Sequence, residues 1–307
     1  MAADRERIPV VPRARHHWTH LLITDVDNTL FDFGLYAEAG LREVLPTGSR
    51  LLGLPVDSVA DEVRAAFRHF NSIEIPFAFE AMPCLADRSA EERLAISKQF
   101  VHAFWRGASQ AMTPYPGVSS TLQHLQRNGT AIVAVSDAPM REVWRKLRRL
   151  GLIQFFAGVV GVGTVVRRRD PLLRDSDIPG YERPSHSPHR FYRGLRDDER
   201  KPSRQAYEAV LREVAVPREL VTVVGDSPTK DLAPARELGL AAYWAAYGER
   251  NRHLETTLQS VTPFEPPEAV ECQAEAASSY PALSSFDDLE DIIPVPQPRL
   301  PRMSRSG

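Results

Sequence analysis

HLLITDVDNTL, residues 20–30, joins an apolar run to two closely spaced acids. Leu21, Leu22 and Ile23 lead directly into Asp25 and Asp27, and the polar residues that follow break the extended chain. Continuous apolar runs are typical of buried parallel strands, and open α/β sheets bind ligands beyond the carboxyl ends of their strands. The stretch therefore predicts a central parallel strand that delivers two carboxylates to a cleft.

Further along the chain, apolar runs and amphipathic segments alternate. After the turn-rich residues 114–117, strands are expected at 130–135, 157–162, 220–224 and 240–245, and helices at 117–128, 139–150, 203–214 and 231–238. Repeated strand–helix units imply a parallel sheet with right-handed crossovers and helices on both faces. The predicted fold class is α/β, a doubly wound parallel sheet.

A helical block, residues 32–112, interrupts this alternation directly after the first strand. Helices are expected at 34–45, 57–70 and 89–108, the last opened by a capping box of Ser89 and Glu92. Apolar residues recur at helical spacing in the second and third segments, which favours a small helical bundle. Its aromatic side chains are expected to form the bundle's own core.

The predicted domain organisation places this block inside a discontinuous α/β core. The core comprises residues 18–31 and 113–262, with an irregular Arg- and Pro-rich insertion at about 163–200. Residues 1–17 are expected to be a disordered lead-in, and residues 263–307 a mostly irregular tail with one last helix at 285–292. The sequence leaves open whether the insertion is disordered or a functional lid.

Composition limits the class of protein. The 307 residues are 43% hydrophobic and 25% charged with a net charge of −2, as is ordinary for a soluble globular protein. This charge gives no general reason to expect a nucleic acid or membrane partner. Two cysteines cannot form a disulfide framework, and no segment reads as a signal peptide or membrane helix. The expected compartment is the cytoplasm.

Polar residues that can take part in catalysis or bind a ligand follow three of the predicted strands. Asp25 and Asp27 end the first, Ser136 ends the second, and the segment GDSPTKD, which holds Asp226 and Asp231, ends the fourth. Four carboxylates at neighbouring strand ends repel one another unless a cation neutralises them. Mg²⁺ suits this place because it binds a few carboxylates together with water and phosphate oxygens.

Lysine is scarce in this chain, which draws attention to the positions it occupies. The four lysines are Lys98, Lys146, Lys201 and Lys230. Lys201 precedes a predicted helix, and a compact cation there suits a site shared by a phosphate and a carboxylate. Lys230 is the alternative cation because it lies within the fourth-strand segment. Lys146 is expected on the solvated flank of its helix.

The ordered set of motifs resembles the haloacid dehalogenase superfamily, in its phosphatase branch. The four motifs appear in sequence as DVDNT at 25–29, Ser136, Lys201 with the following proline, and the segment from 225 to Asp231. The helical block is similar to the C1-type cap of that family. The resemblance spans roughly residues 20–250 and implies a Rossmann-like core carrying an α-helical cap.

The resemblance also implies a role for each residue. Asp25 is expected to be the nucleophile that forms an aspartyl-phosphate, and Asp27 the acid that protonates the leaving oxygen and then activates water. Mg²⁺ is expected between Asp25, the Asp27 backbone carbonyl and Asp226, supported by Asp231. Ser136 and Lys201 are expected to hold the phosphoryl oxygens. The implied activity is Mg²⁺-dependent hydrolysis of a small phosphorylated metabolite.

Several alternatives remain open at this point. Asp27 argues against dehalogenation, since halide leaves without a proton, but phosphomutase or phosphonatase chemistry uses much the same core. A non-catalytic phosphate-binding regulatory protein is a second class. A third is a nucleic acid binder that uses the basic insertion, although a solvated charge run is the simpler interpretation. The substrate's identity, the helical-block residues that set specificity and the oligomeric state stay undetermined.

Overall fold

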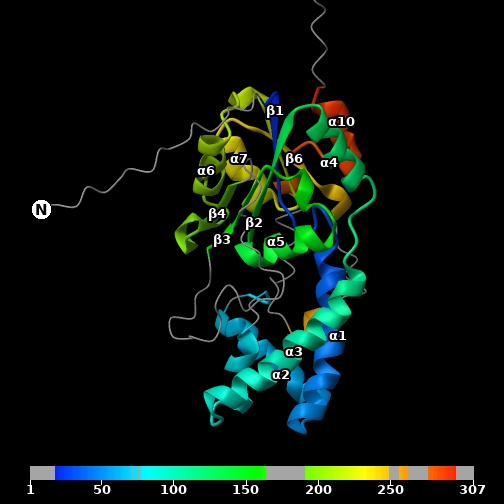
Figure 1. Cartoon of the computed structure of the whole chain (residues 1–307), viewed down its shortest axis with the longest axis vertical. Helices are drawn as coiled ribbons and strands as arrows, with labels where there is room; N and C mark the ends of the chain where they lie inside the picture. The colour runs from blue at the N-terminus through cyan, green and yellow to red at the C-terminus, as the bar shows by residue number, and fades with distance from the viewer. Residues whose placement is uncertain are drawn as a thin grey trace, which may run out of the picture.

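The computed structural model describes residues 18–70, 72–74, 77–163, 191–248, 256–261 and 276–294. The expected lead-in at 1–17, most of the insertion and much of the tail lie outside these residues. Within them, a layered α/β unit stands above a group of long helices (Figure 1). None of the described helices combines the length and apolar character needed to cross a membrane.

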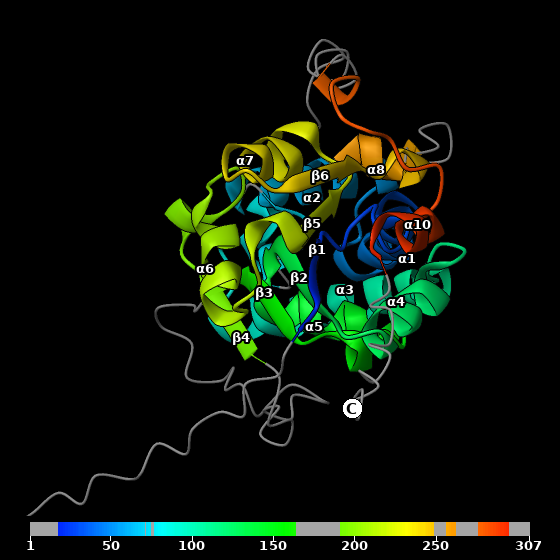
Figure 2. The ribbon, with the colours of Figure 1, turned by 90° about the horizontal axis from the view of Figure 1, so that it is seen from above.

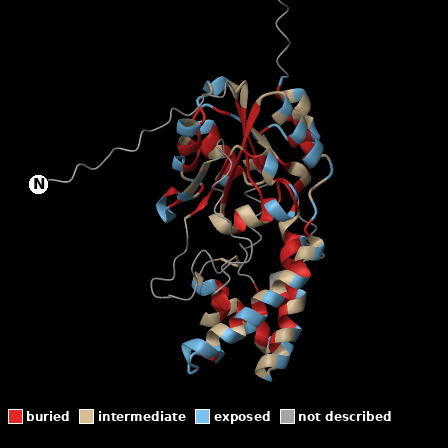
Figure 3. Cartoon of the chain, viewed as in Figure 1, coloured by how far each residue is buried: buried red, intermediate tan, exposed pale blue. Residues whose placement is uncertain are grey.

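Six parallel strands form one sheet in the order β4-β3-β2-β1-β5-β6. Their bounds are β1 His20–Thr24, β2 Thr130–Pro139, β3 Gly158–Val162, β4 Phe191–Leu195, β5 Val221–Gly225 and β6 Ala241–Trp244. The predicted doubly wound α/β fold is confirmed, with the first strand near the middle of the sheet. Burial is densest along β1, β2, β3 and β5, the strands inside the sheet (Figure 3).

Strand β4 is a correction to the expected irregular insertion. It pairs with β3 from Gly158 opposite Phe191 to Val162 opposite Leu195. An edge strand has a single neighbour, so its sequence need not be continuously apolar, and FYRGL carries an arginine and a glycine in five residues. The signal was too weak to separate from the charged segment before it.

Helices cover both faces of the sheet because successive strand residues point to opposite sides. Leu21 and Ile23 pack with helices α6 (Gln205–Glu213) and α7 (Ala233–Glu237). Leu22 faces the other side, where α4 (Val118–Arg127), α5 (Met140–Arg149) and the C-terminal α10 (Leu289–Ile292) lie. Seen from above, the two helical layers flank the strands (Figure 2). In the tail, where a last helix is expected, a 3₁₀ turn, Phe286–Asp288, precedes α10.

The helical block consists of α1 (Phe33–Leu52), α2 (Val56–Phe70) and α3 (Ala90–Ala111). Helix α1 runs beyond its expected end at residue 45, continues through Pro46 and stops at Gly53, whose φ of 68° suits glycine. The capping box of Ser89 and Glu92 opens α3. Helices α1 and α3 pack closely at Gly107, where an added Cβ would lie 2.1 Å from the Ala39 carbonyl oxygen.

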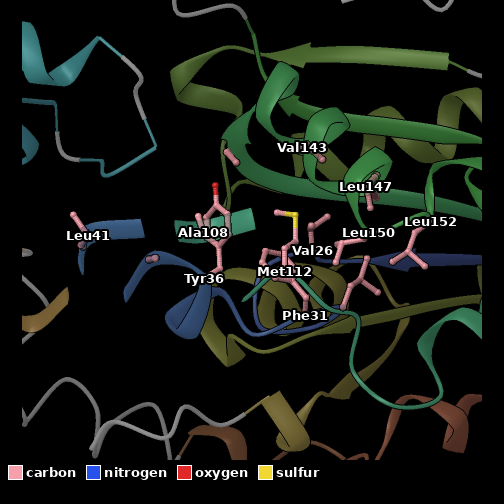
Figure 4. Close-up of a cluster of buried hydrophobic side chains, with 14 of the residues drawn as sticks. Val26, Phe31, Tyr36, Leu41, Ala108, Met112, Val143, Leu147, Leu150 and Leu152 are labelled. Carbon is pink, nitrogen blue, oxygen red and sulfur yellow. The ribbon is translucent and has the colours of Figure 1, made fainter. Parts of the chain in front are cut away.

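The chain passes between the core and the helical block twice, along adjacent paths. The Tyr115 N–H donates to the Leu30 carbonyl at 2.9 Å, and Phe31 forms an isolated β-bridge with Pro114. One cluster of buried apolar side chains continues from the sheet through this crossing into the block, and Figure 4 shows Val26, Phe31, Tyr36 and Met112 within it. The block is therefore seated on the core by apolar contact.

Candidate active site

The predicted acids at the ends of β1 and β5 meet at one edge of the sheet. The two strands are neighbours in parallel register, with Thr24 opposite Val224, and the Asp25 N–H donates to the Val224 carbonyl at 2.9 Å. Asp25 follows β1 directly and is only 7% exposed. Asp226 follows β5 directly, so both carboxylates leave the sheet on the same side.

Lys201 lies between two of these acids. Its Nζ is 2.5 Å from Oδ1 of Asp25 and 2.6 Å from Oδ1 of Asp231, and all three side chains are buried. The backbone N–H of Lys201 donates to Oδ1 of Asp137 at 2.9 Å, which ties it to the end of β2. Lys230, the alternative cation, is exposed. Segments at the ends of three strands thus converge on one lysine, two of them through its ammonium and one through its backbone N–H.

An acidic cluster of Asp25, Asp226 and Asp231 could hold a metal ion, since ligand oxygens of the three lie within 4.8 Å of one another. Asn28, at a positive φ of 55°, donates through Nδ2 to Oδ2 of Asp226 at 3.2 Å. The Ser227 N–H donates to Oδ2 of Asp231 at 3.1 Å. These bonds fix the carboxylates before any cation arrives.

The electrostatics of the cluster favour a divalent cation. When all three carboxylates are ionised, they and the one ammonium leave two negative charges in a largely buried space. Burial is the main reason that the pKa of Asp25 stands well above its usual range. The attraction of Lys201 lowers this pKa, and repulsion from the neighbouring aspartates raises it further. Burial disfavours the Lys201 ammonium, but Asp231 and Asp25 outweigh burial and raise the pKa of Lys201 well above its usual range. An all-oxygen, doubly negative site matches what hard divalent cations bind.

Asp27 points to a different partner. Both of its carboxylate oxygens accept from Nζ of Lys146, at 2.7 Å and 2.8 Å. Lys146 also forms an ion pair with Glu74 of the helical block. The expectation that Lys146 is solvated is wrong, since its side chain is 0% exposed.

The signal for a buried Lys146 was present in the sequence. Val143, Lys146, Leu147 and Leu150 follow the spacing of one helix face, and the structure buries all four. Lysines are almost never fully buried unless they are paired, and the two acidic partners of Lys146 are distant in sequence.

Ser136 lies at the carboxyl-terminal part of β2 and is 2% exposed. Its Oγ accepts from the Ala138 N–H at 3.1 Å, which shapes the turn beyond the strand. Strand β2 is the other neighbour of β1, with Thr24 opposite Ala134, so Ser136 lies at the same edge as Asp25. Among the described residues, the structure brings Asp25, Asp226, Asp231 and Lys201 into direct proximity, while Asp27 is held by Lys146.

Residues that the sequence left unassigned complete the site. Asn28 fixes Asp226, and the buried Tyr207 places its hydroxyl 3.4 Å from Oδ1 of Asp231. Tyr207 follows the apolar spacing of its helix, which gives no sign of this contact. Glu74 had no local signal at all, because its role depends on how the helical block docks on the core.

Comparison with known proteins adds a family to this geometry. A family model described as "haloacid dehalogenase-like hydrolase" matches residues 19–239 of this chain. Two glyceraldehyde 3-phosphate phosphatases are similar in sequence. The protein from Pyrococcus furiosus is 23% identical over 231 residues, covering 75% of this chain and 81% of its own length. The protein from Methanothermobacter thermautotrophicus is 24% identical over 227 residues, covering 71% and 81%.

A solved structure shares the fold. A protein described as a predicted phosphoglycolate phosphatase, from Haemophilus somnus, superposes with a TM-score of 0.50 at 17% identity. The match covers 90% of this chain and 98% of that one. It therefore includes both the sheet and the helical block.

Proposed function

The chain belongs to the haloacid dehalogenase-like hydrolases and is a phosphatase, and we propose that it hydrolyses a small phosphate monoester through a covalent intermediate on Asp25. The observation that carries this proposal is the placement of Lys201 between Asp25 and Asp231, next to Asp226. A buried carboxylate beside a buried ammonium suits attack on a phosphorus whose oxygens need positive charge.

In the first step, a carboxylate oxygen of Asp25 attacks phosphorus and the bond from phosphorus to the leaving oxygen breaks. Asp27, two residues further along the same turn, gives its proton to the leaving oxygen. An alkoxide needs such an acid within hydrogen-bond reach. Lys201 and Ser136, both at this edge of the sheet, would hold the phosphoryl oxygens.

In the second step, water attacks the phosphorus of the acyl phosphate and Asp27 accepts the proton. Inorganic phosphate leaves, and the Asp25 carboxylate is restored. Division into two displacements lets one residue, Asp27, act as the acid in the first step and as the base in the second.

Mg²⁺ would be held by Asp25, Asp226 and Asp231, together with the backbone carbonyl of Asp27. The doubly negative, all-oxygen cluster fits this ion. When bound, it supplies charge neutralisation for the phosphoryl oxygens. Lys201 remains necessary beside it, because it separates two carboxylates that would otherwise repel.

The substrate we propose is small, with glyceraldehyde 3-phosphate the first candidate because both sequence relatives carry that name. A cavity of about 30 Å³ lies beside the Lys146 site, walled by Phe33, Tyr36, Glu74 and Trp105 among others. The helical block, acting as a cap, would then set specificity through these side chains. The low cysteine content keeps the cytoplasm as the proposed compartment.

Release of inorganic phosphate from a panel of sugar phosphates, nucleoside monophosphates, phosphoglycolate and glyceraldehyde 3-phosphate tests this proposal. We expect three-carbon esters to show the highest kcat/KM with Mg²⁺ present. Asp57→Asn, which changes an exposed carboxylate of α2, is the matched control for site variants. No phosphate release from any member would contradict the proposed function.

A further inference from the structure

Lys146 is a buried cation that the phosphatase chemistry described above does not employ. It lies on α5, a core helix, and its side chain is 0% exposed. Burying an ammonium is costly unless carboxylates compensate it. Here two compensate it, one from each part of the molecule: Asp27 of the catalytic turn and Glu74 of the helical block.

The contacts of this ammonium are specific. Both oxygens of Asp27 lie 2.7–2.8 Å from Nζ, so the carboxylate cannot rotate without breaking a bond. The ring centroid of Phe33, at the start of α1, is 4.8 Å from the same nitrogen. Burial disfavours the ammonium, but Asp27 and Glu74 outweigh burial and raise the pKa of Lys146 above its usual range.

The neighbouring turn of α5 repeats the link between core and helical block. The Arg145 guanidinium stacks on the Trp105 ring of α3, with its central carbon 3.3 Å from the ring centroid. Arg145 also pairs with Glu142 on its own helix. Two adjacent cations of one core helix thus contact the helical block, but only Lys146 also bonds a proposed catalytic residue.

We propose that Lys146 is a positioning residue that fixes the Asp27 carboxylate and, through Glu74, makes this orientation depend on the helical block being seated. Asp27 must present an oxygen first to the leaving group and then to water. A carboxylate held at both oxygens by a buried ammonium has one orientation, whereas a free one samples many. Misplacement of a reacting group by about 1 Å can cost roughly 100-fold in rate. The inference rests on the proposed function, because it assigns Lys146 an effect only through Asp27.

Glu74 supplies the dependence on the helical block. When the block is seated, the Lys146 ammonium forms ion pairs with both Glu74 and Asp27. When the block moves away, Lys146 loses one of its two carboxylates and the cavity beside it opens to water. The orientation of Asp27 is then held by a hydrated lysine, which is a weaker constraint.

A double-mutant cycle in kcat tests the positioning role. Wild type, Lys146→Met, Asp27→Asn and the double variant are compared with p-nitrophenyl phosphate as substrate. We expect Lys146→Met to lower kcat by roughly 10- to 100-fold with little change in KM. In the Asp27→Asn background the same change should have almost no further effect, since coupled residues are not additive. Arg149→Met, an exposed cation on the same helix, is the matched control.

Equal losses in both backgrounds would mean that Lys146 acts independently of Asp27, and would overturn the inference. A wild type that hydrolyses no phosphate monoester would instead overturn the proposed function, and this inference with it. The two failures are therefore distinguishable.

Glu74→Gln gives a second route in case Lys146→Met does not fold. It keeps the size of the side chain and leaves the pair of Lys146 with Asp27 intact. We expect a smaller loss of kcat than with Lys146→Met, again absent in the Asp27→Asn background. Thermal unfolding of the Glu74 and Lys146 single and double variants measures the link without any activity assay. Additive changes in Tm would refute the link to the helical block.

Discussion

Replacing Lys201 with methionine removes the cation from between two buried carboxylates. Nζ lies 2.5 Å from Asp25 and 2.6 Å from Asp231, and the lysine side chain is 4% exposed. At an effective dielectric constant of about 20, each attraction is worth roughly 6 kcal/mol before desolvation is counted. Methionine replaces most of the apolar stem of lysine but removes the ammonium, with its charge and its two hydrogen bonds.

The net cost is smaller than these attractions because burying the ammonium is itself unfavourable. Removal of one partner of a buried ion pair costs about 3–5 kcal/mol. In a chain of this size, each kcal/mol lowers Tm by about 2–4 °C, so a fall of roughly 6–20 °C is expected. Activity should be lost as well, since the phosphoryl group would then face two uncompensated carboxylates.

Thermal unfolding and phosphate release, measured with and without Mg²⁺, provide the assay. Added Mg²⁺ should recover part of the Tm of Lys201→Met, because the ion can neutralise the same carboxylates, but should not recover activity. Lys230→Met is the matched control, since that lysine is exposed and lies within the segment from 225 to 231. An unchanged Tm and normal turnover in Lys201→Met would refute the reasoning.

Three further predictions concern the acidic cluster and the Lys146 site. In Gly225→Ala, the new Cβ would lie 2.4 Å from Cγ of Asp231, so unfolding measurements should show a loss of about 1–3 kcal/mol together with reduced turnover. Burial raises the pKa of Glu74 to about 7, so the folded chain binds this proton more tightly than the unfolded chain. The stability that the protonated Glu74 carboxyl contributes is fully present below about pH 4.5 and is lost as pH rises through about 7. Glu74→Gln should therefore show a flatter dependence of Tm on pH over that window. If Tm of the variant falls with pH in parallel with that of the wild type, the raised pKa of Glu74 is contradicted. Removal of metal with EDTA should abolish turnover, while Mg²⁺ at a hundred times its Kd should add about 2.7 kcal/mol of stability. Asp226→Asn should lose most of that gain, and equal gains in both proteins would exclude Asp226 as a ligand.

Most of the sheet could be predicted because buried parallel strands leave a strong local record. The apolar runs of β1, β2, β3, β5 and β6 are visible locally, and helical spacing follows β1, β2 and β5, which defines the α/β order. The edge strand β4 left no such record, since an arginine and a glycine interrupt its short apolar run, FYRGL. Strand ends also converge by topology, so Asp25, Asp226, Asp231 and Lys201 could be grouped before their distances were known.

The contact between core and helical block could not be predicted in the same way. Glu74 has no motif and lies near Lys146 only because the block docks on α5. Lys146 carried a periodic signal, but the rule that isolated lysines are exposed argued against it. Lys146 is buried because it pairs with two carboxylates, Asp27 and Glu74, that lie far from it in the sequence. A pattern within a short stretch of sequence does not show either partner.

Rapid acid quench of the working enzyme tests the covalent route most directly. With a ³²P-labelled monoester, we predict a labelled protein whose label maps to the peptide that contains Asp25. The label should be absent in Asp25→Asn, which should also be inactive, and it should persist longer in Asp27→Asn because water is then poorly activated. Full turnover by Asp25→Asn without any labelled protein would contradict a nucleophilic Asp25.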